Sequence, residues 1–386
     1  MPVVSTTEDT DRNALMGPTW SVAVFVMFLA LPCPGWPAVL GNVGQTVSAE
    51  RSVDAVDHRR EHLEQIVVDR LAFYATQYPE IAFVVLDSSG DVARNMHVLA
   101  QLIGEDPIPL DYAHPEDMRR ELLFVTLMRI ELLLQTDVGS STLFKVGKGA
   151  LASRKNVCVV TLDPWAIAED DRSATLHLLD LPKSELDAIP PGRYLNHESH
   201  LRFALDHEIY HCLDSRYNGP QPMSHLEHWG DYMMLRDEAG ADAFGVIMNI
   251  AAHGAITAYA RTLRNVRGLA LLEDDPNHYT YEAIGAALQM DPVALERADV
   301  RERFRIATKI RNRTGGDYDD YVRYAVAAYH AMKALGVQPM EEKFSRGTVD
   351  RELVQALVRQ TRSCYRDLVG RDMPPVQPQK PSDKAR

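Results

Sequence analysis

Cysteine is scarce in this chain of 386 residues, and no two cysteines have the CxxC spacing of a thiolate metal site. The four cysteines are Cys33, Cys158, Cys212 and Cys364. The lack of a CxxC pair argues against a zinc knuckle. If a leader that contains Cys33 is removed, three cysteines remain. An odd number this small does not indicate a fold built on disulfide bonds. We expect Cys212 to be a small buried apolar residue.

Positive charge is also scarce. The chain has 41 Lys and Arg against 54 Asp and Glu, which gives a formal net charge of −13. Phosphate recognition needs clustered Lys and Arg, so we expect no nucleic-acid partner. Gly147-Lys148-Gly149 lacks the spacing of a Walker phosphate loop, so a surface turn is favoured over a nucleotide-binding enzyme.

Charge is absent altogether from residues 13–49. Residues 20–31 form an apolar run, and Pro32 and Pro34 follow it. This pattern is typical of a signal-peptide core rather than a full membrane span, although the preceding stretch is acidic where a basic one is usual. A start at Met16 would remove that stretch. We predict that residues 1–49 are a signal peptide or membrane anchor and that the protein is exported (periplasmic or secreted) or anchored to a membrane; a buried or disordered apolar tail is the alternative.

The pattern of apolar residues after residue 50 first indicates a mixture of helices and strands and then, from residue 196, helices alone. The spacing of apolar residues predicts helices at 53–78, 92–103 and 115–134, strands at 81–86 and 156–162, a strand and turn within 141–151, and a loop at 180–192. We therefore predict a mostly α, α+β fold, with a small sheet in residues 50–195, a helical half at 196–370 and a disordered proline-rich tail at 371–386.

The first chemical motif lies at residues 207–211, where the sequence reads HEIYH. In a helix, residues four apart lie on one face, so His207 and His211 can reach one metal ion. Glu208 is adjacent to the first ligand and can contact a water on the metal without becoming a ligand itself. This is the spacing of a zinc hydrolase.

A catalytic zinc usually has three protein ligands and one open position, so a third ligand is required. Histidine at the short HExxHxxGxxH spacing is absent, because Tyr217 stands there. The candidate is Glu238, in a predicted helix at 231–250 and among small residues that allow two helices to approach closely. Asp242 lies four residues later and could accept a hydrogen bond from a ligand imidazole.

HExxH followed by a second helix with Glu-x-x-x-Asp resembles the gluzincin metallopeptidases, the thermolysin-like zincins. The matching residues are His207, Glu208, His211, Glu238 and Asp242, within about 45 residues of the chain. The resemblance implies a zincin-like domain with one Zn²⁺, bound by the two histidines and Glu238. It also implies that Glu208 is the general base, that Asp242 supports the ligands, and that the substrate is a peptide or protein.

The resemblance further implies an edge strand that binds extended substrate, and residues 157–162 precede the motif in the right order for it. It also implies a His or Tyr that donates a hydrogen bond to the oxyanion. The sequence does not single one out among His225, His228, Tyr217, His253, Tyr279 and Tyr281. His225 or His228 could instead replace Glu238 as a ligand, or lie on the surface.

Two other classes remain open. A non-catalytic helical binding protein could retain a vestigial metal site. A di-iron carboxylate bundle would use Glu208 and His211 as one Glu-x-x-His unit, but no second unit is present in the sequence.

Overall fold

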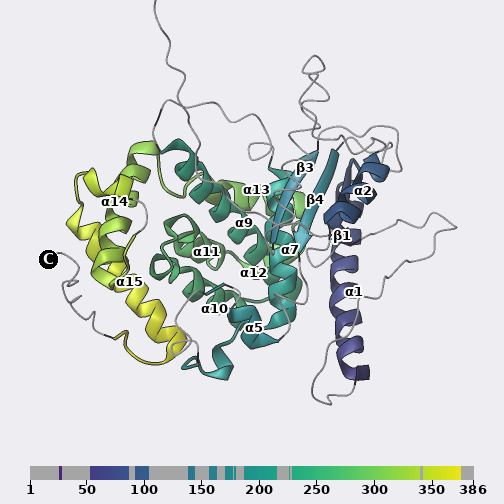
Figure 1. Cartoon of the computed structure of the whole chain (residues 1–386), viewed down its shortest axis with the longest axis horizontal. Coiled ribbons are helices and arrows are strands. Elements are labelled where there is room, and N and C mark those ends of the chain that lie inside the picture. The colour runs from purple at the N-terminus through teal and green to yellow at the C-terminus, as the bar shows by residue number, and fades with distance from the viewer. Residues whose placement is uncertain are drawn as a thin grey trace, which may run out of the picture.

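A computed structural model describes residues 26–27, 53–86, 92–103, 138–143, 156–162, 170–176, 178–179, 187–214, 226, 228–339 and 342–374. Within these residues the protein is mostly helical, with a small sheet in the N-terminal half. The sheet lies at one end of the molecule and the C-terminal helices at the other (Figure 1). The mostly α fold predicted from the sequence is confirmed at this level.

The described sheet has four strands in the order β1-β2-β4-β3. The central strands β2 (Ile81–Leu86) and β4 (Asn156–Leu162) are parallel, with Ile81 opposite Asn156. Both predicted ranges are confirmed, and their apolar side chains are buried, as continuous apolar runs in parallel strands require. The strand expected within 141–151 begins earlier, as β3 (Val138–Leu143), antiparallel to β4.

One sequence-based expectation about the sheet is wrong. The strand at 157–162 is not an edge strand, because β4 pairs with β2 on one side and β3 on the other. Within the described residues the edge is β3, which lies beside the helix that carries the HExxH motif. The other edge is β1 (Val26–Met27), from the predicted leader segment, antiparallel to β2.

The first two predicted helices are present as α1 (Val53–Gln77) and α2 (Val92–Ile103). The helix predicted at 115–134 lies outside the described residues, as do residues 375–386 of the predicted tail. A short helix, α5 (Asp171–Leu176), and a 3-10 turn, η1 (Pro191–Arg193), lead into the helical half. None of the described helices has the length and apolarity needed to cross a membrane.

The helical half is built on α7 (His197–Leu213) and α9 (Trp229–His253), which pack against each other. The side chain of Asn196 caps α7 by accepting a hydrogen bond from the Ser199 amide. α9 packs against α10 (Ala258–Arg267), η3 (Pro276–His278), α11 (Tyr281–Ala287), α12 (Pro292–Arg297), α13 (Val300–Arg311) and α14 (Tyr318–Leu335). The other elements pack mainly on α14, and they are η2 (Ala270–Leu272), η4 (Glu342–Arg346) and α15 (Arg351–Val369).

Glycines in α9 allow this helix to approach α7 closely. A β-carbon at Gly240 would collide with the phenol ring of Tyr210, and one at Gly245 with the ring of Phe203. Both aromatic residues belong to α7 and are buried. The small residues around Glu238 therefore bring the two motif helices together, as the sequence suggested.

A disulfide bond between Cys158 and Cys212 joins β4 to α7, with 5.6 Å between the two Cα atoms. The expectation that Cys212 is merely a small buried residue is therefore wrong. The two cysteines are 54 residues apart, so their proximity follows from the packing of α7 on β4 and not from local spacing. Cys364 is free and buried.

Candidate metal centre

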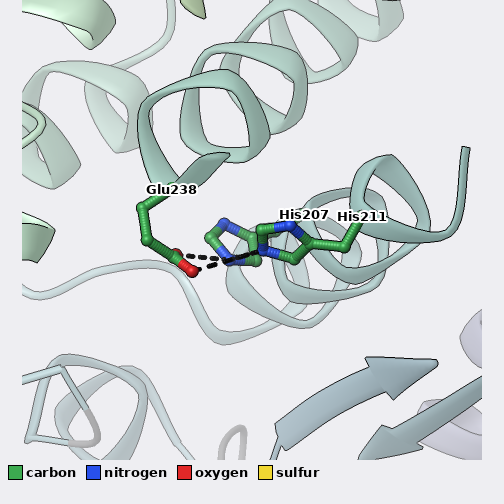
Figure 2. Close-up of side chains that lie close together, drawn as sticks. All are labelled: His207, His211 and Glu238. Atoms are coloured by element: carbon green, nitrogen blue, oxygen red, sulfur yellow. Dashed lines mark hydrogen bonds and ion pairs between the residues drawn. The ribbon is translucent and has the colours of Figure 1, made fainter. Parts of the chain in front are cut away.

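His207 and His211 of α7 and Glu238 of α9 direct their side chains toward one another (Figure 2). One ligand atom from each lies within 4.8 Å of the others, so this group could hold a metal ion. Both histidines are buried, and the Glu238 side chain is 13% exposed. The fold thus brings together the three residues that the sequence named as ligands.

The candidate ligand atoms of these three residues lie close to one another. Nε2 of His207 lies 3.3 Å from Nε2 of His211 and 3.1 Å from Oε2 of Glu238. Nε2 of His211 lies 3.4 Å from Oε1 of Glu238. Bonds of about 2.0–2.1 Å at tetrahedral angles place ligand atoms about 3.3 Å apart. The two imidazole nitrogens have this separation, and each contacts a different oxygen of Glu238, so the group could hold a metal ion.

Asp242 lies one turn beyond Glu238 on α9, and its side chain is fully buried. Its Oδ1 atom is 2.9 Å from Nδ1 of His207. The ion pair with Arg267 and the hydrogen bond from His207 keep the pKa of Asp242 below its ordinary value despite burial. An anionic Asp242 fixes the Nδ1–H tautomer of His207, which leaves the lone pair of Nε2 free for a metal.

Charge in the cluster also favours a cation. Burial alone would lower the pKa of His207, but Glu238 and Asp242 raise it to about 10 in the metal-free protein. Burial would raise the pKa of Glu238, but the surrounding imidazoles hold it well below its ordinary value. A metal ion can take the place of the proton on His207, because both are cations between the same groups.

Glu208 lies next to the first histidine on α7 and is buried. Its Oε1 atom is 3.9 Å from Nε2 of His207. The carboxylate therefore lies beside the atom of His207 that would bind a metal, outside the group of three ligands.

His278, in η3, was missed by the sequence analysis. Its Nε2 atom is 3.3 Å from Oε2 of Glu238, and its Nδ1 atom is 2.5 Å from Oδ2 of Asp275. Burial opposes protonation, but Glu238 and Asp275 raise the pKa of His278 to about 10. No local pattern relates this histidine to residues 207–211, and only the fold brings it to Glu238.

The oxyanion candidates named from the sequence make other contacts in the structure or lie outside the described residues. His228 immediately precedes α9, with its ring 4.5 Å from that of Phe344, and His253 ends α9 bonded to the Asn249 carbonyl. Tyr279 and Tyr281 stack on each other. Neither these four nor any other described residue joins the ligand group. His225 and Tyr217 lie in the part that the structure does not describe.

Buried arginine–aspartate pairs hold both motif helices in place. Asp206, which precedes His207, accepts hydrogen bonds from Arg70 of α1 at 2.6 and 2.7 Å. Asp237, which precedes Glu238, is paired with the fully buried Arg311 of α13. Such pairs contribute little net stability but cost several kcal/mol when one partner is removed. They fix α7 against α1 and α9 against α13.

No family model, curated protein or solved structure matches the chain. The fold and the site define a mostly helical protein with a buried His-His-Glu group that could hold a metal ion.

Proposed function

We propose that the protein is a zinc-dependent hydrolase that cleaves peptide bonds, with the gluzincin-like arrangement of HExxH on one helix and ExxxD on the next. The observation that carries the proposal is the convergence of His207, His211 and Glu238, with one ligand atom from each within 4.8 Å of the others and Glu208 beside them. Two His and one Glu are an established ligand set of catalytic zinc, and they leave the fourth position open.

A bound zinc would supply Lewis acidity toward the scissile carbonyl and lower the pKa of water. Glu208 accepts the proton of the attacking water and transfers it to the leaving amine. The Nε2–H of His278 contacts Glu238 in this structure, and Asp275 holds the other ring nitrogen. With substrate bound, this Nε2–H would turn from Glu238 to donate a hydrogen bond to the oxygen that becomes negative. The ring of His278 is one-third exposed beside Glu238, so substrate can reach it.

Backbone groups of β3 supply a place for substrate. β3 is an edge strand of the described sheet and lies against α7. An extended peptide can add to such an edge through main-chain hydrogen bonds. We assign to β3 the role that the sequence analysis gave to 157–162.

The Cys158–Cys212 disulfide supports export to an oxidising compartment. A stable disulfide is unusual in a reducing cytosol, where thioredoxin and glutathione keep thiols reduced. We therefore retain the proposal that residues 1–49 direct the protein out of the cytoplasm or anchor it to a membrane.

The test compares wild type with Glu208→Gln, using zinc content and cleavage of a mixture of internally quenched peptides. The amide cannot accept the water's proton, so hydrolysis should fall by about 10²-fold or more while zinc content is unchanged. Glu198→Gln is the control, because Glu198 lies in the first turn of α7, where its carboxylate contacts His62.

The same experiment distinguishes a hydrolase from the alternative, a non-catalytic binding protein with a vestigial metal site. Zinc-loaded wild type that cleaves no peptide, or Glu208→Gln that cleaves as wild type does, would favour that alternative. A di-iron bundle is disfavoured, because the described residues contain only one group of three or more candidate ligands.

A further inference from the structure

Residues outside α7 and α9 hold the carboxylate of Asp242 in place. Besides His207, its carboxylate contacts Arg267, whose Nε is 2.8 Å from Oδ2 and whose Nη2 donates to Oδ1 at 3.0 Å. The hydroxyl of Thr280 donates to Oδ2 at 2.5 Å. Both oxygens are therefore engaged, in a side chain with no exposed surface.

These two donors come from different elements. Arg267 is the last residue of α10, and Thr280 immediately precedes α11. The side chain of Arg267 is 12% exposed and Thr280 is 1% exposed, so water does not readily substitute for either donor. Neither residue belongs to the ligand group or to the general-base position.

We propose that Arg267 and Thr280 are positioning residues that orient the ligand His207 through Asp242 and thereby set the metal affinity of the site. The inference rests on the proposed zinc site. The terminal torsion of an aspartate has a broad minimum, so the carboxylate turns easily unless partners hold it. With both oxygens held, Oδ1 stays opposite Nδ1 of His207. Partners of this kind beyond the ligands typically change metal affinity 10–100-fold.

Position 280 offers a matched pair of variants. Thr280→Val keeps the shape of the side chain and removes the hydroxyl donor, whereas Thr280→Ser keeps the donor. Arg267→Gln removes the guanidinium and its charge. A merely structural role for these residues would lower the unfolding temperature without changing the zinc affinity of the folded protein.

The experiment measures the zinc dissociation constant of the full chain by competition with a chromogenic chelator, for wild type and the three variants. We expect binding to weaken about 10-fold in Thr280→Val, to stay within about twofold of wild type in Thr280→Ser, and to weaken 10–100-fold in Arg267→Gln. The visible absorption of the cobalt-substituted protein should change in Thr280→Val and not in Thr280→Ser, because only the former frees His207 to turn.

Wild-type affinity in Thr280→Val and Arg267→Gln would overturn the inference, as would equal losses in Thr280→Val and Thr280→Ser. If Arg267→Gln fails to fold, the pair at position 280 decides alone. Wild type that binds no zinc would overturn the proposed function itself, which distinguishes that failure from failure of the inference.

Discussion

Glu238 contacts three imidazoles, and they have different roles. His207 and His211 approach its carboxylate from α7 at 3.1 and 3.4 Å. His278 approaches from η3 at 3.3 Å, and Asp275 holds its other nitrogen. His207 and His211 form the candidate ligand group together with Glu238. His278 lies outside this group, and its side chain is more exposed than theirs. Glu238 of α9 therefore lies between the two candidate metal-binding histidines and the proposed substrate contact.

Substitution of His278 tests whether this residue donates a hydrogen bond to the oxyanion. In His278→Ala, kcat should fall about 10²–10³-fold, the usual effect of losing one oxyanion donor, while zinc content stays at the wild-type level. Peptide cleavage and zinc analysis on the same preparation provide the measurement. His253→Ala is the control, since His253 bonds to a backbone carbonyl at the far end of α9. Unchanged kcat in His278→Ala would show that His278 has no part in the reaction.

The residues that the sequence identified are those whose relation is local. His207 and His211 share one face of α7, and Glu238 and Asp242 share one face of α9, because each pair is four residues apart. The link between the two helices came from the need for a third ligand and from the gluzincin resemblance. His278, Arg267 and Thr280 reach the same centre by tertiary packing of separate elements. No spacing rule connects them to the motif, so they could not be identified from the sequence.

At the scale of elements, the site depends on the close contact of α7 with α9. Gly240 lies two residues after Glu238 and faces the ring of Tyr210. Tyr210 in turn directly precedes the ligand His211 on α7. A side chain at position 240 would therefore separate the two helices at the level of the ligands.

We expect Gly240→Ala to lower the free energy of unfolding by about 1–3 kcal/mol, because the added methyl overpacks the interface. Zinc binding should weaken as well. Gly230→Ala is the matched control on α9, since a β-carbon there has no neighbour within 4 Å. It should be neutral or stabilising by about 0.5–1 kcal/mol. Chemical denaturation of the zinc-free proteins gives both values, and equal effects at the two positions would contradict this role for the helix contact.

The two central strands were predicted correctly, because nearly all of their side chains are buried. Which strands lie side by side in the sheet was predicted poorly. The apolar runs of β2 and β4 read directly as strands. The neighbour of each strand is a tertiary property, so β4 was mistaken for an edge strand although β3 covers it. The Cys158–Cys212 bond was missed for the same reason, because it joins a strand to a helix 54 residues later.

At the scale of the whole molecule, a metal would change the response of stability to pH. Without metal, the folded pKa of His207 is raised from 6.5 to about 10. Its stabilising contribution is then complete below about pH 6.5 and is lost as pH rises toward 10. With metal bound, His207 is an unprotonated ligand and this alkaline loss disappears, while metal affinity itself grows as fewer protons compete.

The increase in unfolding temperature that zinc produces should therefore become larger from pH 6.5 to pH 9. Calorimetry of zinc-loaded and chelator-treated protein across this interval measures it. His207→Gln provides the control, because it removes the titrating ring and the ligand together and should abolish the zinc effect at every pH. A zinc effect in wild type that is constant or shrinks with pH would contradict this account of the site.

The most direct test of the central claim is the zinc stoichiometry of wild type, His207→Ala and Glu238→Ala, with His228→Ala as control. One zinc per chain is expected in wild type and in His228→Ala, and far less in the other two, since each removes one of three ligands. Wild type without zinc, or Glu238→Ala with full zinc occupancy, would contradict the assignment of His207, His211 and Glu238 as a metal centre.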